Sequence, residues 1–175
     1  GEPVSATNQG LKDSDIRPAF HSQILAPWHR NSDSLVLDEL ALQNGVVRAD
    51  IVVVNGTLSA YEIKSDKDSL VRLSAQMEAY NAVFDRVTIL TTPRHQRRVA
   101  KRVPSWWGIV LCRSSDASVI AFETYRESTA NTRQVEMTEG TLVRRFPDVR
   151  VKADGAKAKF TIKGGLGYSS TLALN

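Results

Sequence analysis

Apolar residues recur at two different spacings along the chain, and the two spacings predict different elements. Short runs rich in valine, isoleucine and leucine, bounded by turn residues, predict strands over 46–54, 57–64, 86–92, 106–112 and 118–125. Apolar positions three or four residues apart predict a helix over about 69–84, which Asp68 would cap, and a short basic helix is predicted over 94–102.

One more helix is predicted upstream of the first strand. Ser32, Asp33 and Ser34 can cap it, its leucines supply the apolar positions, and it would run to about Gln43. The resulting order, α-β-β-α-β-α-β-β, predicts an α/β fold with a mixed sheet flanked by helices.

Composition shifts divide the chain into three predicted parts. Residues 1–30 are polar and interrupted by prolines, which predicts a loosely ordered lead-in to a core over 31–126. Residues 127–175 form a C-terminal appendage, with a short helix over 138–146 followed by a basic β-hairpin. A two-residue Asp154-Gly155 turn would pair residue 153 with 156 and 151 with 158. Its lysines fit solvated edge strands better than a wing-like DNA contact, though both interpretations stay open.

Net charge and cysteine content narrow the class of protein. A formal charge of +4 and a pI of about 9.4 favour an anionic partner. The single cysteine, Cys112, excludes a disulfide framework, and its apolar setting predicts a buried, inert thiol. No apolar run approaches membrane-spanning length, so we expect a cytoplasmic protein without a membrane partner; the sequence does not indicate an oligomeric state.

The residues with the clearest chemical potential are Asp50, Glu62 and Lys64, around a predicted hairpin. Because strand side chains alternate, Glu62 and Lys64 project together while Ile63 points away. Two carboxylates that can hold a divalent cation, with an ammonium beside them, suit metal-assisted phosphodiester cleavage.

The hairpin register tests this interpretation. A two-residue Asn55-Gly56 loop would place Asp50 opposite Tyr61, whereas a three-residue loop over 55–57, or a bulge, would place Asp50 opposite Glu62. Facing carboxylates repel each other unless a cation lies between them. A functional site therefore predicts the longer loop, and two merely solvated acids predict the tight turn.

These residues resemble the PD-(D/E)XK nuclease superfamily, whose motif is an acid on one strand followed by acid-x-lysine on the next. Gln76 and Tyr80 are similar to the Gln-x-x-x-Tyr element of its RecB-like and lambda-exonuclease-like branch, and Glu39, with Asp38 as the fallback, is similar to the acid that precedes the hairpin. The stretch from about 36 to 113 also resembles small bacterial nuclease-like proteins. Ala49 departs from the pattern, because it stands where the motif has proline.

The resemblance implies a restriction-endonuclease-like α-β-β-α-β core and a nuclease that uses Mg²⁺ or Mn²⁺, with DNA as the preferred substrate. It implies that Asp50, Glu62 and the carbonyl of Ile63 are metal ligands and that Lys64 positions or activates water. Glu39 would complete a second metal site, and Gln76 and Tyr80 would orient the substrate strand. The alternatives are a catalytically silent nuclease-fold module that binds nucleic acid or a partner protein, and an RNA-cleaving toxin domain.

Basic residues on two predicted helices are candidates for contact with a nucleic-acid backbone. A solvated helix surface is the competing interpretation. The candidates are Arg72, Arg94, Arg97, Arg98, Lys101 and Arg102.

Overall fold

The computed structural model describes most of the first three-quarters of the chain and three short strands beyond it. For those three strands it describes the backbone only. The described residues are 10–42, 45–116, 119–131, 144–145, 150–154, 157–163 and 169–174.

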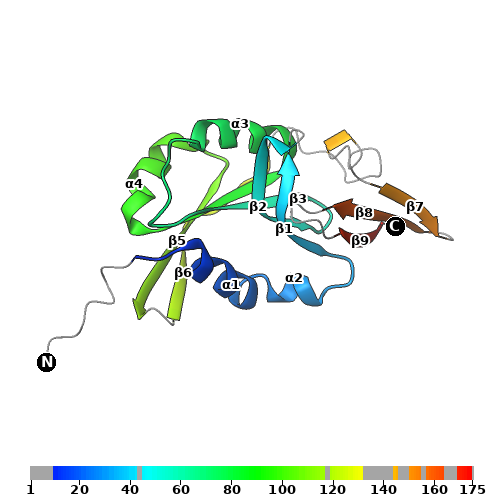
Figure 1. Ribbon diagram of the computed structural model, residues 1–175, viewed down its shortest axis with the longest axis horizontal. Helices are drawn as coiled ribbons and strands as arrows, with labels where there is room; N and C mark the ends of the chain where they lie inside the picture. The colour runs from blue at the N-terminus through cyan, green and yellow to red at the C-terminus, as the bar shows by residue number, and fades with distance from the viewer. Residues whose placement is uncertain are drawn as a thin grey trace, which may run out of the picture.

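Within these residues, a mixed sheet of six strands runs in chain order, β1-β2-β3-β4-β5-β6 (Figure 1). Strands β1, β2 and β3 are antiparallel, β3, β4 and β5 are parallel, and β6 returns antiparallel to β5. The bounds are β1 (Leu35–Leu42), β2 (Val47–Val54), β3 (Leu58–Lys64), β4 (Arg86–Thr91), β5 (Gly108–Asp116) and β6 (Val119–Arg126).

Helices cover both faces of this sheet (Figure 1). On one face, α1 (Asp13–Gln23) and α2 (Ala26–Arg30) contribute to an apolar cluster that includes Phe20 and Ile63. On the other face, α3 (Leu73–Val83) and α4 (Pro93–Arg102) pack against a cluster that contains Trp107. The predicted mixed sheet flanked by helices is confirmed. None of the described helices is long and apolar enough to cross a membrane.

Two predictions for the N-terminal third are wrong. The helix predicted to run to Gln43 is strand β1, in which Leu35, Leu37, Leu40 and Leu42 all face the core. Residues 10–30, predicted to be loosely ordered, form α1 and α2, because Pro18 is accommodated within α1 and Pro27 lies in the first turn of α2.

The start of α3 also differs from the prediction. Asp68 does not cap this helix, which begins at Leu73 with Arg72 as its N-cap residue. The Asp68 carboxylate accepts hydrogen bonds from the backbone N–H and the hydroxyl of Ser65 instead. It therefore closes the turn that follows β3.

A second, three-stranded antiparallel sheet consists of β7 (Arg150–Asp154), β8 (Lys157–Lys163) and β9 (Ser169–Leu174). The predicted hairpin exists as β7 and β8, but residue 153 pairs with 158 rather than 156, so the register is displaced by two residues. The helix predicted over 138–146 lies outside the described residues except for 144–145. The division of the chain into three parts stays a prediction.

Candidate functional site

The loop between β2 and β3 sets the geometry of the acidic residues. Val54 pairs with Leu58 and Ile51 pairs with Tyr61, so the loop has three residues, 55–57. Gly56 has a φ of 94°, and the N–H of Asn55 donates to the carbonyl of Thr57 at 3.1 Å. Continuing this register places Asp50 opposite Glu62, as the functional interpretation of the hairpin requires.

A third acid extends this pair across the neighbouring strand. Asp38 pairs with Ile51 and Leu40 pairs with Ala49, so Glu39 lies at the level of Asp50. Glu39 has a φ of 55°, a left-handed conformation that is uncommon and strained for a residue other than glycine. We call Glu39, Asp50 and Glu62, which lie side by side on β1, β2 and β3, the acidic row.

Arg17 of α1 reaches into the acidic row. Its Nη2 donates to Glu39 Oε1 at 2.9 Å and to Asp50 Oδ1 at 3.1 Å, and its Nη1 donates to the Asp50 carbonyl at 2.8 Å. On the same helix Asp13 receives two further bonds from this guanidinium, at 2.8 and 3.0 Å. Burial alone would lower the pKa of Arg17, but the hydrogen bond to Asp13 and the charges of Asp50 and Glu39 raise it above its usual value.

The inner end of the row is almost completely buried. Glu62 is 2% exposed and Lys64 5% exposed, and the Lys64 Nζ lies 3.2 Å from Glu62 Oε1. The Tyr80 hydroxyl, from α3, donates to Glu62 Oε2 and accepts from the N–H of Asp50. The other oxygen of Asp50, Oδ2, accepts from the N–H of Ile63 at 2.8 Å.

The carboxyl groups of the row hold protons more tightly than isolated carboxyls do. Burial, followed by the charge of Asp50, raises the pKa of Glu62 well above its usual value. Burial also raises the pKa of Asp50, while its hydrogen bonds to Ile63 and Glu62 lower it. Glu39 has a raised pKa through burial and the charge of Asp50.

Five of the predicted site residues therefore come together: Glu39, Asp50, Glu62, Lys64 and Tyr80. Gln76 is buried on α3, but within the described part of the chain its Oε1 has no hydrogen-bond partner. Ile63 contributes its N–H to the site, whereas the resemblance implied its carbonyl. Asp38, the fallback for Glu39, lies on the other side of Arg17, with the His21 Nε2 2.7 Å from its Oδ1.

The arrangement does not fit a divalent metal as it is folded. The Arg17 guanidinium lies between the carboxylates that would be ligands, and the two oxygens of Glu62 are engaged by Lys64 and by the Tyr80 hydroxyl. In the described part of the chain, no group of three or more His, Cys, Asp or Glu side chains is placed to hold a metal ion. The Mg²⁺ or Mn²⁺ cofactor stays a prediction, and no chemical step is derived from it.

Arg17 is the residue that sequence reasoning missed. It lies in a segment that its prolines marked as loosely ordered, 33 residues before Asp50. A signal was present, because Ile16 and Phe20 are one helical turn apart and Asp13 and Arg17 form an i,i+4 ion pair.

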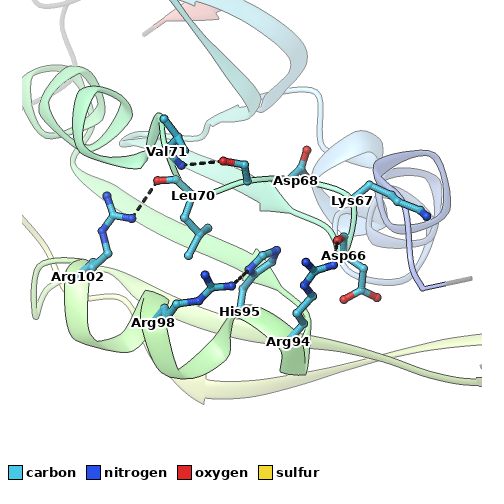
Figure 2. A pocket seen from close by; sticks show the side chains of 10 residues that line it. Asp66, Lys67, Asp68, Leu70, Val71, Arg94, His95, Arg98 and Arg102 are labelled. Atoms are coloured by element: carbon cyan, nitrogen blue, oxygen red, sulfur yellow. Dashed lines mark hydrogen bonds between the residues drawn. The ribbon is translucent and has the colours of Figure 1, made fainter. Parts of the chain in front are cut away.

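A second candidate site is a cavity of about 560 Å³ between α4 and the loop after β3 (Figure 2). Arg94, Arg98 and Arg102 line it from α4, at spacings of one helical turn. The predicted basic group is thereby divided, since Arg72, Arg97 and Lys101 are exposed but do not line the cavity. The remaining lining residues are Asp66, Lys67, Asp68, Ser69, Leu70, Val71 and His95.

Neutral groups hold the three guanidiniums in place. Arg94 donates to the carbonyl of Asp66 at 2.8 Å, Arg98 to His95 Nδ1 at 3.0 Å, and Arg102 to the carbonyl of Leu70 at 2.9 Å (Figure 2). Across the ranges that the structure describes, none of the three forms an ion pair with a carboxylate. Each therefore keeps its charge and several N–H donors for another group.

The two acids in the cavity wall have other partners. Asp66 accepts from the N–H of Leu11 at 2.7 Å and from the hydroxyl of Thr92 at 2.6 Å. Asp68 is bonded to Ser65, as described above. Because Lys67 and three arginines outnumber these two carboxylates, the cavity has a positive formal charge.

A further cavity, of about 430 Å³, lies between the segment before α1 and the end of β5, and Cys112 is among its lining residues. Burial raises the pKa of Cys112 to about 12. The thiol therefore stays protonated at neutral pH, in agreement with the buried, inert cysteine expected from the sequence.

Comparison with known proteins identifies a family. The family model described as "Bacteriophage P4 protein cII" matches residues 19–145, well over half of the chain. The protein named "Protein cII" of Enterobacteria phage P4 is 42% identical over 88 residues, which are 50% of this chain and 33% of that protein. The chain thus covers about a third of the length of this relative. No solved structure matches.

These matches overturn the assignment to the PD-(D/E)XK superfamily, and with it the nuclease fold and the metal-dependent phosphodiesterase. The nucleic-acid partner stays a prediction. The motif spacing and the hairpin register both agreed with the superfamily pattern, but this agreement was not specific enough to identify a member of that superfamily. Since the matching model spans most of the described core, the chain belongs to the bacteriophage P4 protein cII family.

Proposed function

We propose that this domain binds the phosphate backbone of a nucleic acid through the arginine-lined cavity beside α4. The proposal concerns binding alone, and its basis is the set of three guanidiniums on one helix face. In the described residues these groups have no carboxylate partner, and they line one side of a cavity large enough to admit a phosphate group.

The spacing of the arginines favours a ligand that carries more than one anionic group. Guanidinium groups bind phosphate oxygens in a bidentate manner, and the three arginines recur along the helix axis at intervals of about 6 Å. Such a row suits a ligand with repeated anionic groups. A nucleic-acid backbone is a ligand of this kind, and the net positive charge of the chain would assist its approach.

His95 prepares one of these contacts. Its Nε2 lies 3.0 Å from the carbonyl of Ser65, which can only accept, so the hydrogen is on Nε2 and Nδ1 is free to accept from Arg98. His95 is 2% exposed. The guanidinium of Arg98 is consequently held toward the cavity, which reduces the entropy that a ligand would otherwise have to remove.

The test is fluorescence anisotropy with labelled single-stranded and double-stranded oligonucleotides, between about 50 and 200 mM salt. We expect the affinity to fall with rising salt, and Arg94→Ala to weaken binding and reduce the slope of log K against log salt by about one. Arg97→Ala is the matched control, since Arg97 is exposed on the same helix but does not line the cavity. Equal losses in both variants, or no binding by the wild-type protein, would contradict the proposal.

A further inference from the structure

The acidic row contains its own cation. The guanidinium of Arg17 makes hydrogen bonds to Asp13, Glu39 and Asp50, and it lies 3.8 Å from Asp38 Oδ1. Its Nε, Nη1 and Nη2 atoms form five hydrogen bonds, to the carboxylates of Asp13, Glu39 and Asp50 and to the Asp50 carbonyl. Its side chain is only 17% exposed.

Both carboxylate oxygens of Asp50 and both of Glu62 already have partners. One oxygen of Asp50 is bonded to Arg17 and the other to the N–H of Ile63. Glu62 has Lys64 on one oxygen and the Tyr80 hydroxyl on the other. A divalent cation that entered the row would have to break several of these bonds, because it needs carboxylate oxygens as ligands.

Arg17 is also fixed in position by the helix that carries it. Ile16 and Phe20, on either side of Arg17 in α1, are 0% and 1% exposed and belong to the apolar cluster beneath β2 and β3. The guanidinium cannot leave the row by moving the helix without exposing these side chains. Rotating the side chain alone would leave the carboxylates of Asp13, Glu39 and Asp50 without their shared donor.

We infer that Arg17 is the permanent counter-ion of the acidic row, and that the row takes no divalent cation while Arg17 is present. This inference is independent of the proposed function, since α1 and α4 lie on opposite faces of the sheet (Figure 1). Removing the guanidinium should convert the row into a cation site, because Asp13, Glu39 and Asp50 would then face one another without a compensating charge.

The experiment is a titration with Mn²⁺, in which free Mn²⁺ is measured by electron paramagnetic resonance and stability by thermal unfolding. We expect the wild-type protein to bind no Mn²⁺ at micromolar concentrations and to show no change in Tm. Arg17→Gln should lower Tm by roughly 10 °C in EDTA. It should also bind one Mn²⁺ and recover part of that loss when the metal is added.

Two other variants separate the charge from general destabilisation. Arg17→Lys keeps a cation in the row and should remain free of Mn²⁺, and Arg97→Gln, which removes an exposed arginine elsewhere, should behave as wild type. One Mn²⁺ bound by the wild-type protein would overturn the inference, and so would an Arg17→Gln variant that folds and binds none. If Arg17→Gln does not fold, the wild-type and Arg17→Lys titrations decide. Mn²⁺ binding by either protein would show that a cationic side chain at position 17 does not exclude the metal.

Discussion

Glu62 shows how much one buried carboxyl group can govern the pH dependence of stability. Burial and the charge of Asp50 raise its pKa, so the folded protein binds the proton more tightly than the unfolded chain does. This contribution to stability is fully present below the unfolded pKa of about 4.3 and is lost as pH rises toward the raised folded pKa. The raised pKa values of Asp50 and Glu39 act in the same direction.

Replacing Glu62 with glutamine should remove this pH dependence. Glutamine keeps the shape and can still accept from Tyr80, but it carries no charge at any pH. We expect the difference in unfolding free energy between Glu62→Gln and wild type to shift in favour of the variant as pH increases from about 5 to 8. Urea denaturation at several pH values measures it, with Glu78→Gln, at an exposed position of α3, as the control. A difference that does not vary with pH would mean that Glu62 titrates normally.

At the scale of elements, the β2–β3 loop determines whether the acidic row exists. Gly56 has a φ of 94°, and a Cβ added there would contact nothing within 4 Å. A substitution therefore costs only backbone strain, and Gly56→Ala should lower the unfolding free energy by about 1–2 kcal/mol. Gly56→Asn should lower it less, because asparagine tolerates the left-handed region. Chemical denaturation of the two variants checks the order, and equal stabilities would argue against this loop conformation.

Elements were predictable where one periodicity dominated. Strands β2 to β6 were found from apolar runs bounded by turn residues and α3 from helical spacing, within a few residues at their ends. Helix α4 was expected as a short basic helix. Strand β1 was mistaken for a helix because its buried leucines do not alternate throughout. Leu35 and Leu37 face the core on odd positions, but Leu40 and Leu42 do so on even ones, since the chain changes face at Glu39, where φ is positive. The resulting three-residue spacing between Leu37 and Leu40 imitates a helix.

The candidate sites were predictable to the extent that their residues lie close together in sequence. Asp50, Glu62 and Lys64 were found from local spacing, and Tyr80 was added by the resemblance to a nuclease motif. Arg17 was not, because its place in the row depends on how α1 packs across the sheet, which no local pattern specifies. The same limit explains why the six basic candidates could not be divided into the three that line the cavity and the three that do not.

At the scale of the whole molecule, α1 holds together strands that are distant in the chain. Phe20 is 1% exposed, and its ring lies 4.9 Å from that of Tyr61 on β3 and 5.3 Å from that of Phe122 on β6, measured between centroids. Phe20→Ala should lower the unfolding free energy by about 3–5 kcal/mol, as for other large buried aromatic residues. Ile24→Ala, at a position 43% exposed, is the control and should change it by less than about 1 kcal/mol. Urea denaturation compares the two, and similar effects would mean that α1 is not part of the core.

The strands of the six-stranded sheet lie side by side in the same order as they occur in the chain, and this has a consequence for folding kinetics. Each strand pairs with the one made just before it, so the sheet can grow one strand at a time as the chain is synthesised, and no strand has to wait for a distant partner. Helix α1 is the exception. It precedes the six-stranded sheet in the chain, yet it needs β6, the last strand of that sheet, for the contact of Phe20 with Phe122 and for the bond from Gln23 to the carbonyl of Ile120. The contacts of α1 with the sheet are therefore complete only once β6 has formed, although the carboxylates of β1 and β2 that Arg17 neutralises are in place earlier.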